Sequence, residues 1–266
     1  MSYLTPPESE EAVITPRRGG TEAPVASRTL MTFTRPDYFE VCRLAQAKGQ
    51  ARNFADCPVR EGCWQGEAIT LAGPVLGAPF AVVVLEKLLA LGARIVIALG
   101  WCGSLRPEVT IGELVLPERA YSEEGTSAHY PGADLEPRPD LRLFQSLNEQ
   151  LLQSAATFHT GQVWTTDAIY RETKYKVETY GARGMLAVEM EMSALFNVAQ
   201  YRGAALAGLL VVSDELFSLK WRHGARQEVF QQSRRLAAAV ALDALASFQP
   251  SAAAQKRGSR SFTGCV

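Results

Sequence analysis

Two short and almost wholly apolar runs constrain the fold of this chain more than any other feature. They are residues 94–99 (RIVIAL) and 206–212 (LAGLLVV). A strand that is apolar on both faces is typical of a parallel sheet covered by helices on each side. Helical patterns surround both runs, over residues 79–91 before the first and over 184–202 and 225–248 around the second. The alternation predicts an α/β fold with a largely parallel central sheet.

Weaker patterns complete the sheet and its cover. Two further short strands are expected over Glu67–Ala72 and 113–116. A helix is expected over 139–155, with Asp140 near its start, where a short polar side chain can cap free backbone N–H groups.

The chain is predicted to hold one domain between two tails. Residues 29–249 contain no internal repeat and no long linker, so they are expected to form a single domain. Segments 1–28 and 250–266 lack an apolar period and are rich in polar or small residues, which predicts disorder.

Composition excludes several classes of protein. Lys and Arg number 27 and Asp and Glu 28, a net charge of -1, which gives no electrostatic footprint for nucleic acid or for a membrane surface. The 5 cysteines and 3 histidines are scattered without a CxxC pair, so neither a metal site nor a small disulfide scaffold is expected. Charged residues interrupt the apolar stretch 80–101, and the first residues do not resemble a signal peptide. We expect a cytoplasmic protein.

The fold class indicates where a ligand would bind. In sheets of this kind, ligands collect beyond the carboxyl ends of the strands. Two segments follow the apolar runs directly: Gly100-Trp101-Cys102-Gly103-Ser104, and Ser213-Asp214-Glu215. The glycines would let backbone approach a ligand closely, although a tight turn without a ligand gives the same pattern. Asp214 could act as a general acid if burial raises its pKa, or simply cap the next segment.

Val188-Glu189-Met190-Glu191 is the other candidate, because it places two carboxylates in an apolar stretch. Carboxylates are rarely buried unless they are paired or hydrogen-bonded. Residues i and i+2 do not share a helix face, so one carboxylate is expected to be structural and the other to face a ligand. A carboxylate that accepts two hydrogen bonds suits the neighbouring hydroxyls of a ribose. A polar stripe on an amphipathic helix is the alternative.

Taken in order, these segments resemble the nucleoside phosphorylase superfamily, in particular its hexameric purine nucleoside and uridine phosphorylases. The resemblance covers about residues 65–245. It rests on GAP at 77–79, LGAR at 91–94, GWCGS at 100–104, IGELV at 111–115, EGTSAHY at 124–130, TTDAIY at 165–170, VEME at 188–191 and VVSD at 211–214. VEME followed by a strand that ends in SD is the most informative pair.

The resemblance implies a three-layer αβα fold around a mixed sheet and cleavage of the bond between a base and C1′ of ribose. It implies that Glu191 holds the ribose hydroxyls, that Met190 packs on the sugar, and that Val188 and Glu189 help to form the wall of the site. Asp214 falls where purine-specific members keep an acid that protonates the base. Ser213, Ile169 and the segment from Gly100 through Trp101 and Cys102 to Gly103 complete the predicted substrate site. No cofactor is implied, and the partners are a nucleoside, phosphate and further copies of the chain, from dimer to hexamer.

The departures from the family concern phosphate. The positions of its usual arginine and hydroxyl are Ala98 and Trp101 here. Phosphate could be held by Arg35, Arg106, Arg171, backbone amides of 100–104 or a neighbouring subunit. Three hypotheses remain: a nucleoside phosphorylase, with purine nucleosides favoured by Asp214; a nucleosidase that uses water; and a non-catalytic protein that binds nucleosides.

Overall fold

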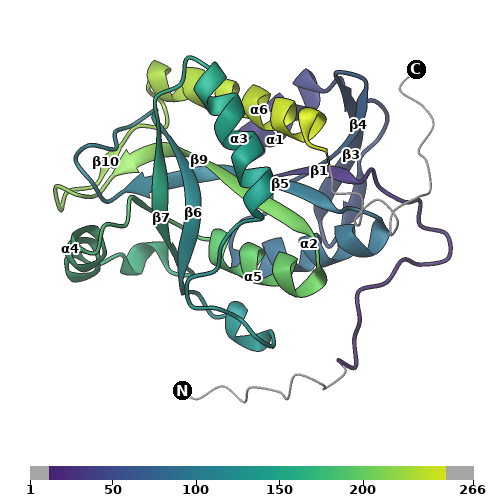
Figure 1. The fold of residues 1–266 in the computed structure, drawn as a ribbon, viewed down its shortest axis with the longest axis horizontal. Helices are drawn as coiled ribbons and strands as arrows, with labels where there is room; N and C mark the ends of the chain where they lie inside the picture. Colours follow the sequence, from purple (N-terminus) through teal and green to yellow (C-terminus); the bar gives the residue numbers. More distant parts are fainter. Residues whose placement is uncertain (1–11, 250–266) are drawn as a thin grey trace.

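A mixed sheet between two layers of helices forms the body of the protein (Figure 1). The structure is a computed structural model that describes residues 12–249. Segments 1–11 and 250–266 of the predicted tails therefore lie outside the described residues. Within 12–249, the sheet comprises β1 (Arg28–Thr32), β2 (Arg52–Phe54), β3 (Cys57–Trp64), β4 (Glu67–Ala72), β5 (Ile95–Ser104), β6 (Leu114–Glu123), β7 (Phe158–Thr166), β8 (Ala187–Glu189), β9 (Ala205–Glu215) and β10 (Arg222–His223).

The strand order confirms the α/β class and corrects the expectation of a largely parallel sheet. The order is β10-β9-β6-β7-β8-β5-β1-β4-β3-β2, and β9 also pairs with β5, which closes β9, β6, β7, β8 and β5 into a ring. In the described part of the chain, five strand pairings are parallel and five antiparallel. The two apolar runs do pair in parallel, as β5 with β9. Three of the antiparallel pairings belong to hairpins, β2 with β3, β3 with β4 and β9 with β10. The other two, β8 with β5 and β6 with β9, are part of the closed ring.

Helices cover both faces, and each face has its own core. The helices are α1 (Arg35–Leu44), α2 (Ala78–Leu91), α3 (Leu141–Gln153), α4 (Lys174–Ala182), α5 (Met192–Arg202) and α6 (Glu228–Ser247), with short 3₁₀ turns η1 (Ser127–His129) and η2 (Ile169–Arg171). Side chains of α2 and α5 build one core, and those of α1, α3 and α6 build the other (Figure 1). A smaller cluster under α4 includes Leu105, Val177 and Val188. No helix within the described residues has the length and apolarity needed to cross a membrane.

Most elements predicted from periodicity are present, with longer strands than expected. The helix predicted over 79–91 is α2, and the one predicted over 139–155 is α3, whose first turn is capped by the Asp140 side chain accepting from the Leu143 N–H at 2.9 Å. The predicted strands at Glu67–Ala72 and 113–116 are β4 and the start of β6. The helix predicted over 225–248 is α6.

Two local predictions were wrong. Residues 184–202 are not one helix: β8 (Ala187–Glu189) comes first and α5 starts at Met192. The strand forms because β8 finds partners in β5 and β7 during ring closure, which periodicity cannot reveal. Residues 100–104 are not a turn after the strand, because β5 continues through Ser104 with β9 beside it along its length.

The end of the predicted N-terminal tail packs against the domain. Val25 and Ala26 are buried, and the Ala26 N–H donates to Thr70 Oγ1 at 2.9 Å. Arg28 opens β1 and donates to the carbonyls of Leu245 and Phe248 at 2.8 and 3.1 Å. The packed body therefore includes residues 25–28.

Candidate active site

The sheet register brings several predicted site residues into one row. Asp214 in β9 lies beside Gly103 in β5, and Gly103 lies beside Val188 in β8. A Cβ on Gly103 would lie 3.1 Å from Asp214 Oδ2 and 2.4 Å from Leu216 Cδ1, so only glycine leaves this close approach open. Cys102 is buried next to this row, and burial together with the charges of Asp214 and Glu189 raises the pKa of its thiol well above the usual range. Strands far apart in sequence thus converge at the ends of β5 and β9.

Glu189 has a structural role. Its carboxylate accepts hydrogen bonds from the N–H groups of Glu191 and Met192, both at 2.7 Å, and from the Thr165 hydroxyl. The free N–H groups at the start of α5 need such acceptors. Burial raises the pKa of the carboxyl, while these donors act in the opposite direction. Glu189 therefore ends β8 and begins α5, and all its contacts are with the protein itself.

Glu191 is the second buried carboxylate, with fewer contacts than Glu189. It is 2% exposed, and its Oε1 accepts from the Gly77 N–H at 2.6 Å, at the start of α2. A Cβ built on Gly77 would meet nothing within 4 Å, so the backbone here borders open space. No lysine or arginine of residues 12–249 forms an ion pair with Glu191. Burial and then the charge of Glu189 raise its pKa well above the usual range. The contacts of Glu189 fit the structural role predicted for one of the two carboxylates, and the ligand-facing role of Glu191 stays a prediction.

Asp214 is held by two hydrogen-bond donors. The Ser213 hydroxyl donates to Oδ1 at 2.6 Å and the Trp221 indole N–H to Oδ2 at 2.9 Å. Burial raises the pKa of the carboxyl, whereas both donors favour its ionised form. Ser213 is itself buried, and its hydroxyl also contacts the Cys102 carbonyl at 3.3 Å. Trp221 comes from the loop between β9 and β10.

Trp101 lies with the opposite core and does not line this row. Its indole packs edge-on against Phe230 of α6 at 4.9 Å and donates its N–H to Asp37 Oδ2 at 2.7 Å. Asp37 is 1% exposed and also pairs with Arg234 at 3.1 Å. The direction of the Trp101 side chain follows from the alternation of side chains along a strand. Neighbouring Gly100 faces the other side of the sheet, where a Cβ would lie 2.2 Å from the Phe33 ring.

Two predicted residues stand apart from the buried carboxylates. Ile169 lies on η2, is 52% exposed and belongs to none of the three apolar clusters of residues 12–249. Met190, between the two glutamates, is only partly buried.

Comparison with known proteins decides the family. The model of the phosphorylase superfamily matches residues 31–247. The chain belongs to the phosphorylase superfamily. Among characterised relatives of this superfamily, a guanosine phosphorylase of Halorubrum lacusprofundi is 25% identical over 177 residues, 66% of this chain and 72% of that protein. A purine nucleoside phosphorylase of Bacillus cytotoxicus is 28% identical over 159 residues, 59% and 68% of the two chains.

Solved structures of the superfamily agree in fold. Uridine phosphorylase from Vibrio fischeri superposes with a TM-score of 0.76 at 25% identity, covering 84% of this chain and 93% of its own. Purine nucleoside phosphorylase from Toxoplasma gondii, in complex with immucillin-H, gives 0.77 at 21% identity and covers 84% and 91%. The fold expected from the sequence resemblance is thereby confirmed.

Three arginines, Arg35, Arg106 and Arg171, were predicted as candidates for binding phosphate. Their positions in the structure suit that role less well than the prediction assumed. Arg106 is bound to Glu108 at 2.8 Å and to the Gly181 carbonyl at 3.0 Å. Arg35 and Arg171 are exposed, with Arg35 over the Phe39 ring at 5.9 Å. The amides of 100–104 lie in a strand paired with β9. Ala98 is fully buried in the core against α2 and α5.

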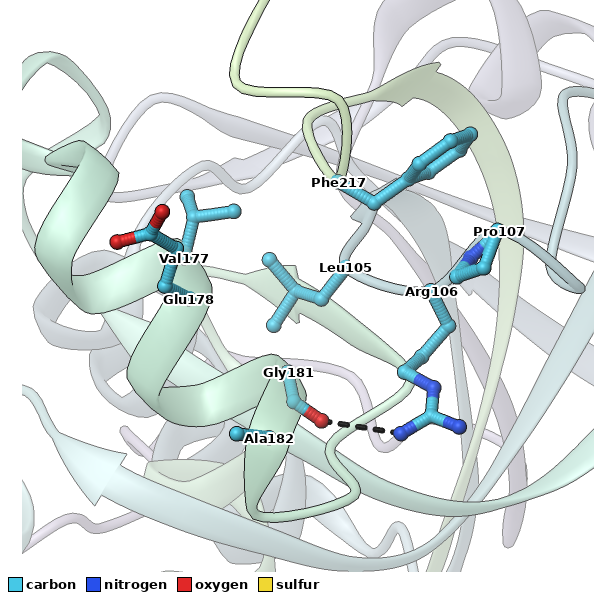
Figure 2. Close-up of a pocket in the computed structure, with 8 residues that line it drawn as sticks. All are labelled: Leu105, Arg106, Pro107, Val177, Glu178, Gly181, Ala182 and Phe217. Atoms are coloured by element: carbon cyan, nitrogen blue, oxygen red, sulfur yellow. Dashed lines mark hydrogen bonds between the residues drawn. The ribbon is translucent and has the colours of Figure 1, made fainter.

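A hollow of about 340 Å³ lies beside α4, where Leu105 and Val177 of the small cluster form part of its lining (Figure 2). It is lined by Leu105, Arg106, Pro107, Val177, Glu178, Gly181, Ala182 and Phe217. Of the residues predicted to contact substrate, only Arg106, a candidate for phosphate, lines it. The Arg106 guanidinium donates to the Gly181 carbonyl across the hollow at 3.0 Å.

Sequence patterns missed one neighbour of Asp214 and the buried ion pair that holds Trp101 in the opposite core. Trp221 lies outside the resembling segments and is identified by its bond to Asp214. Asp37 and Arg234 lie far apart in the chain and form the buried pair that fixes Trp101. An isolated tryptophan or ion pair cannot be recognised from the sequence, because its structural role depends on contacts with residues far away in the chain.

Proposed function

We propose that this protein cleaves the N-glycosidic bond of a purine nucleoside and transfers the ribosyl group to inorganic phosphate. The observation that carries the proposal is Glu191, a buried carboxylate without a cationic partner among residues 12–249, held at the start of α2 by the Gly77 N–H. Membership of the phosphorylase superfamily supports the reaction class. No cofactor takes part, and phosphate is the second substrate.

Glu191 anchors the sugar in this proposal. A carboxylate accepts hydrogen bonds from the 2′- and 3′-hydroxyls of ribose, and its negative charge favours the positive charge that develops on the sugar during cleavage. The Gly77 N–H holds one oxygen in position. Met190 borders the sugar, and Val188 with Gly103 forms the wall toward the base. Glu189 supports this arrangement through α5 rather than by contacting substrate.

The base subsite lies at the end of β9. Asp214 and Ser213 present polar atoms there, next to Gly103. A purine offers ring nitrogens that can accept a proton from a carboxyl group, whereas the residue pair expected for uracil recognition is absent from the loop after β7. Characterised relatives named as guanosine and purine nucleoside phosphorylases support the same preference.

Hydrolysis is the second candidate, and a specific observation favours it. The positions at which the family resemblance would place phosphate contacts are Ala98, buried in one core, and Trp101, bound to Asp37 in the other. Water could attack C1′ without those contacts. In that case, the product is free ribose rather than ribose 1-phosphate.

One experiment separates the alternatives. The purified chain is incubated with guanosine, inosine, adenosine and uridine, with and without 10-fold excess phosphate over nucleoside, and released base is measured. Phosphate-dependent release of a purine supports the proposal, and phosphate-independent release supports hydrolysis. Binding without release would indicate a non-catalytic protein. Glu178→Gln, a change at an exposed carboxyl of α4, serves as the matched control for Glu191→Gln.

The same resemblance leads us to propose a cytoplasmic homo-oligomer built from dimers, up to a hexamer. Exposed apolar side chains near the site support an interface there: Ile169, Tyr170, Tyr175 and Trp221 are 52%, 96%, 75% and 71% exposed. Light scattering of the purified protein gives the mass directly. A monomer at micromolar concentration would contradict this part of the proposal.

A further inference from the structure

Trp221 is an exposed aromatic residue in direct contact with a predicted site carboxylate. Its indole N–H donates to Asp214 Oδ2 at 2.9 Å, while the residue as a whole is 71% exposed. The substrate site predicted from the sequence held one aromatic residue, Trp101, whose ring packs on Phe230 in the opposite core. Trp221 therefore brings an exposed aromatic ring to the end of β9, where the base is proposed to bind.

The hairpin of β9 and β10 determines the position of Trp221. β10 lies beside β9 at one edge of the sheet (Figure 1). In this antiparallel pair, His223 lies opposite Asp214 and Arg222 lies opposite Glu215. The Arg222 guanidinium also forms an ion pair with the Glu215 carboxylate at 2.9 Å. Because Trp221 comes directly before β10, this pairing keeps its backbone close to Asp214.

The loop that leads to Trp221 is attached to the domain at its other end. The Leu216 N–H donates to the Ser104 carbonyl of β5 at 2.9 Å, and the Leu219 N–H donates to the Leu216 carbonyl at 2.7 Å. Leu216 and Leu219 pack against the small cluster under α4, which includes Val188 from the predicted wall of the site. The loop is therefore held at the ends of β5 and β9, the strands that carry Gly103 and Asp214.

The two oxygens of Asp214 have partners of different chemistry. Oδ1 accepts from the Ser213 hydroxyl at 2.6 Å, and Oδ2 accepts from the Trp221 indole. A hydroxyl can donate or accept, whereas an indole N–H can only donate. A proton on Asp214 therefore belongs on Oδ1. The indole N–H stabilises the carboxylate that forms when this proton leaves, because donors favour the ionised form.

A base that is hydrogen-bonded to Asp214 would lie next to the indole, because both groups bind to the same small carboxyl group. His223 packs against the Trp221 ring, with ring centroids 5.3 Å apart and planes tilted by 45°, and the indole still remains largely exposed. Exposed aromatic faces stack on nucleobases, whose rings are flat and polarisable. The Trp221 ring thus offers the base an aromatic surface beside its acid.

We propose that Trp221 completes the base subsite, with its ring packed on the purine and its N–H holding Asp214 Oδ2. The inference rests on the proposed nucleoside cleavage and deepens it. The proton on Asp214 Oδ1 passes to a ring nitrogen of the base while the bond between C1′ and N9 breaks and its electron pair passes to the base. A phosphate oxygen bonds to C1′, and the proton that phosphate releases returns to Asp214 through solvent.

Two variants separate the ring from its N–H. Trp221→Leu removes both and is expected to weaken binding of hypoxanthine, measured by calorimetry, by ~5- to 150-fold, the usual contribution of a base stacked on an aromatic ring. Trp221→Phe keeps a ring and is expected to bind hypoxanthine within roughly threefold of the unmodified protein. Its kcat for inosine is expected to fall ~10- to 100-fold, because the hydrogen bond to the forming carboxylate is lost.

Trp64→Phe is the matched control. The Trp64 indole also donates to an aspartate, Asp243 Oδ1 at 2.8 Å, but this bond joins β3 to α6. The variant is expected to leave both hypoxanthine binding and kcat for inosine unchanged. A loss confined to the Trp221 variants, divided between binding and kcat as described, would not follow from a general loss of stability.

Tryptophan fluorescence provides a readout that does not depend on catalysis. The chain has 4 tryptophans, of which Trp164 is fully buried and Trp64 and Trp101 are partly buried. Hypoxanthine is expected to quench the emission of the unmodified protein and to shift it to shorter wavelength, because the exposed Trp221 ring leaves water. Trp221→Phe is expected to abolish this change, and Trp64→Phe to retain it.

The outcomes separate this inference from the proposed function. If the unmodified protein cleaves inosine but Trp221→Leu binds hypoxanthine as tightly, or Trp221→Phe keeps its kcat, the assignment of Trp221 is overturned and the proposed function stands. A fluorescence change that persists in Trp221→Phe also overturns it. If the unmodified protein cleaves no purine nucleoside, the proposed function fails, and the hypoxanthine titrations still decide whether Trp221 contacts a base.

Discussion

Glu189 and Glu191 are two residues apart, and their replacement is expected to have opposite consequences. Glu189→Ala removes the acceptor for the N–H groups of Glu191 and Met192, both buried at the start of α5. A buried donor left without a partner costs ~1–3 kcal/mol, so two cost about 2–6 kcal/mol. Removing the repulsion between the two carboxylates offsets part of this loss, which leaves roughly 2–4 kcal/mol of destabilisation. For a domain of this size, the expected fall in Tm is ~4–16 °C.

Glu191→Gln is expected to change activity rather than stability. The amide oxygen can still accept from the Gly77 N–H, and the repulsion from Glu189 disappears, so Tm should stay equal or rise. Two charge-assisted hydrogen bonds to the ribose hydroxyls weaken to neutral ones, and the charge that favours the oxocarbenium-like state is lost. Together these effects are worth ~2–4 kcal/mol, or roughly 30- to 1,000-fold in kcat/KM.

Thermal unfolding followed by circular dichroism, together with kcat/KM for guanosine, measures both effects on the same samples. Each variant is the control for the other, because both remove one buried carboxylate from the same three-residue segment, Glu189–Glu191. A fall in Tm for Glu191→Gln as large as that for Glu189→Ala would refute the division into a structural and a ligand-facing carboxylate. Full activity of Glu191→Gln would refute the sugar assignment.

Two further predictions concern the cores. Asp37→Ala leaves the Arg234 guanidinium buried without its carboxylate and is expected to lower the free energy of unfolding by ~3–5 kcal/mol. The control is Arg43→Ala, at the exposed pair with Glu40, which is expected to lower it by less than ~1 kcal/mol. Urea unfolding midpoints compare them, and equal values would contradict a buried network around Trp101. Gly100→Ala places a Cβ 2.2 Å from the Phe33 ring and is expected to destabilise by ~1–3 kcal/mol, whereas Gly20→Ala meets nothing within 4 Å and should leave Tm unchanged. A Gly100→Ala protein as stable as Gly20→Ala would show that the Phe33 ring moves freely.

The local sequence pattern was enough to predict those helices and strands whose signals lie within a few residues of one another. Apolar spacing located α2 and α6, and a single Asp140 located the start of α3, because capping and amphipathicity depend on residues within one or two turns. The two apolar runs identified the parallel pair β5 and β9, since burial on both faces leaves no room for polar residues. The two carboxylates of VEME were predicted to be unequal because residues i and i+2 do not share a helix face, whereas in the structure Glu189 ends β8 and Glu191 precedes α5.

Long-range pairing decided the rest. β8 exists because β5 and β7 supply partners on either side, so residues 184–202 divide into a strand and a helix although their composition suits a helix throughout. The direction of Trp101 depends on strand alternation and on Asp37 and Arg234, which come from opposite ends of the chain.

The sequence by itself determined the α/β class, the superfamily resemblance and the carboxylates from which a site could be built. Only the tertiary structure decided which carboxylate supports α5, which accepts from the Gly77 N–H, and which donors hold Asp214. The physical reason is that the proton affinity of a carboxyl depends on its burial and on donors and charges within a few ångströms. For Asp214, those neighbours come from β5, β8 and the loop after β9, which meet only when the chain folds.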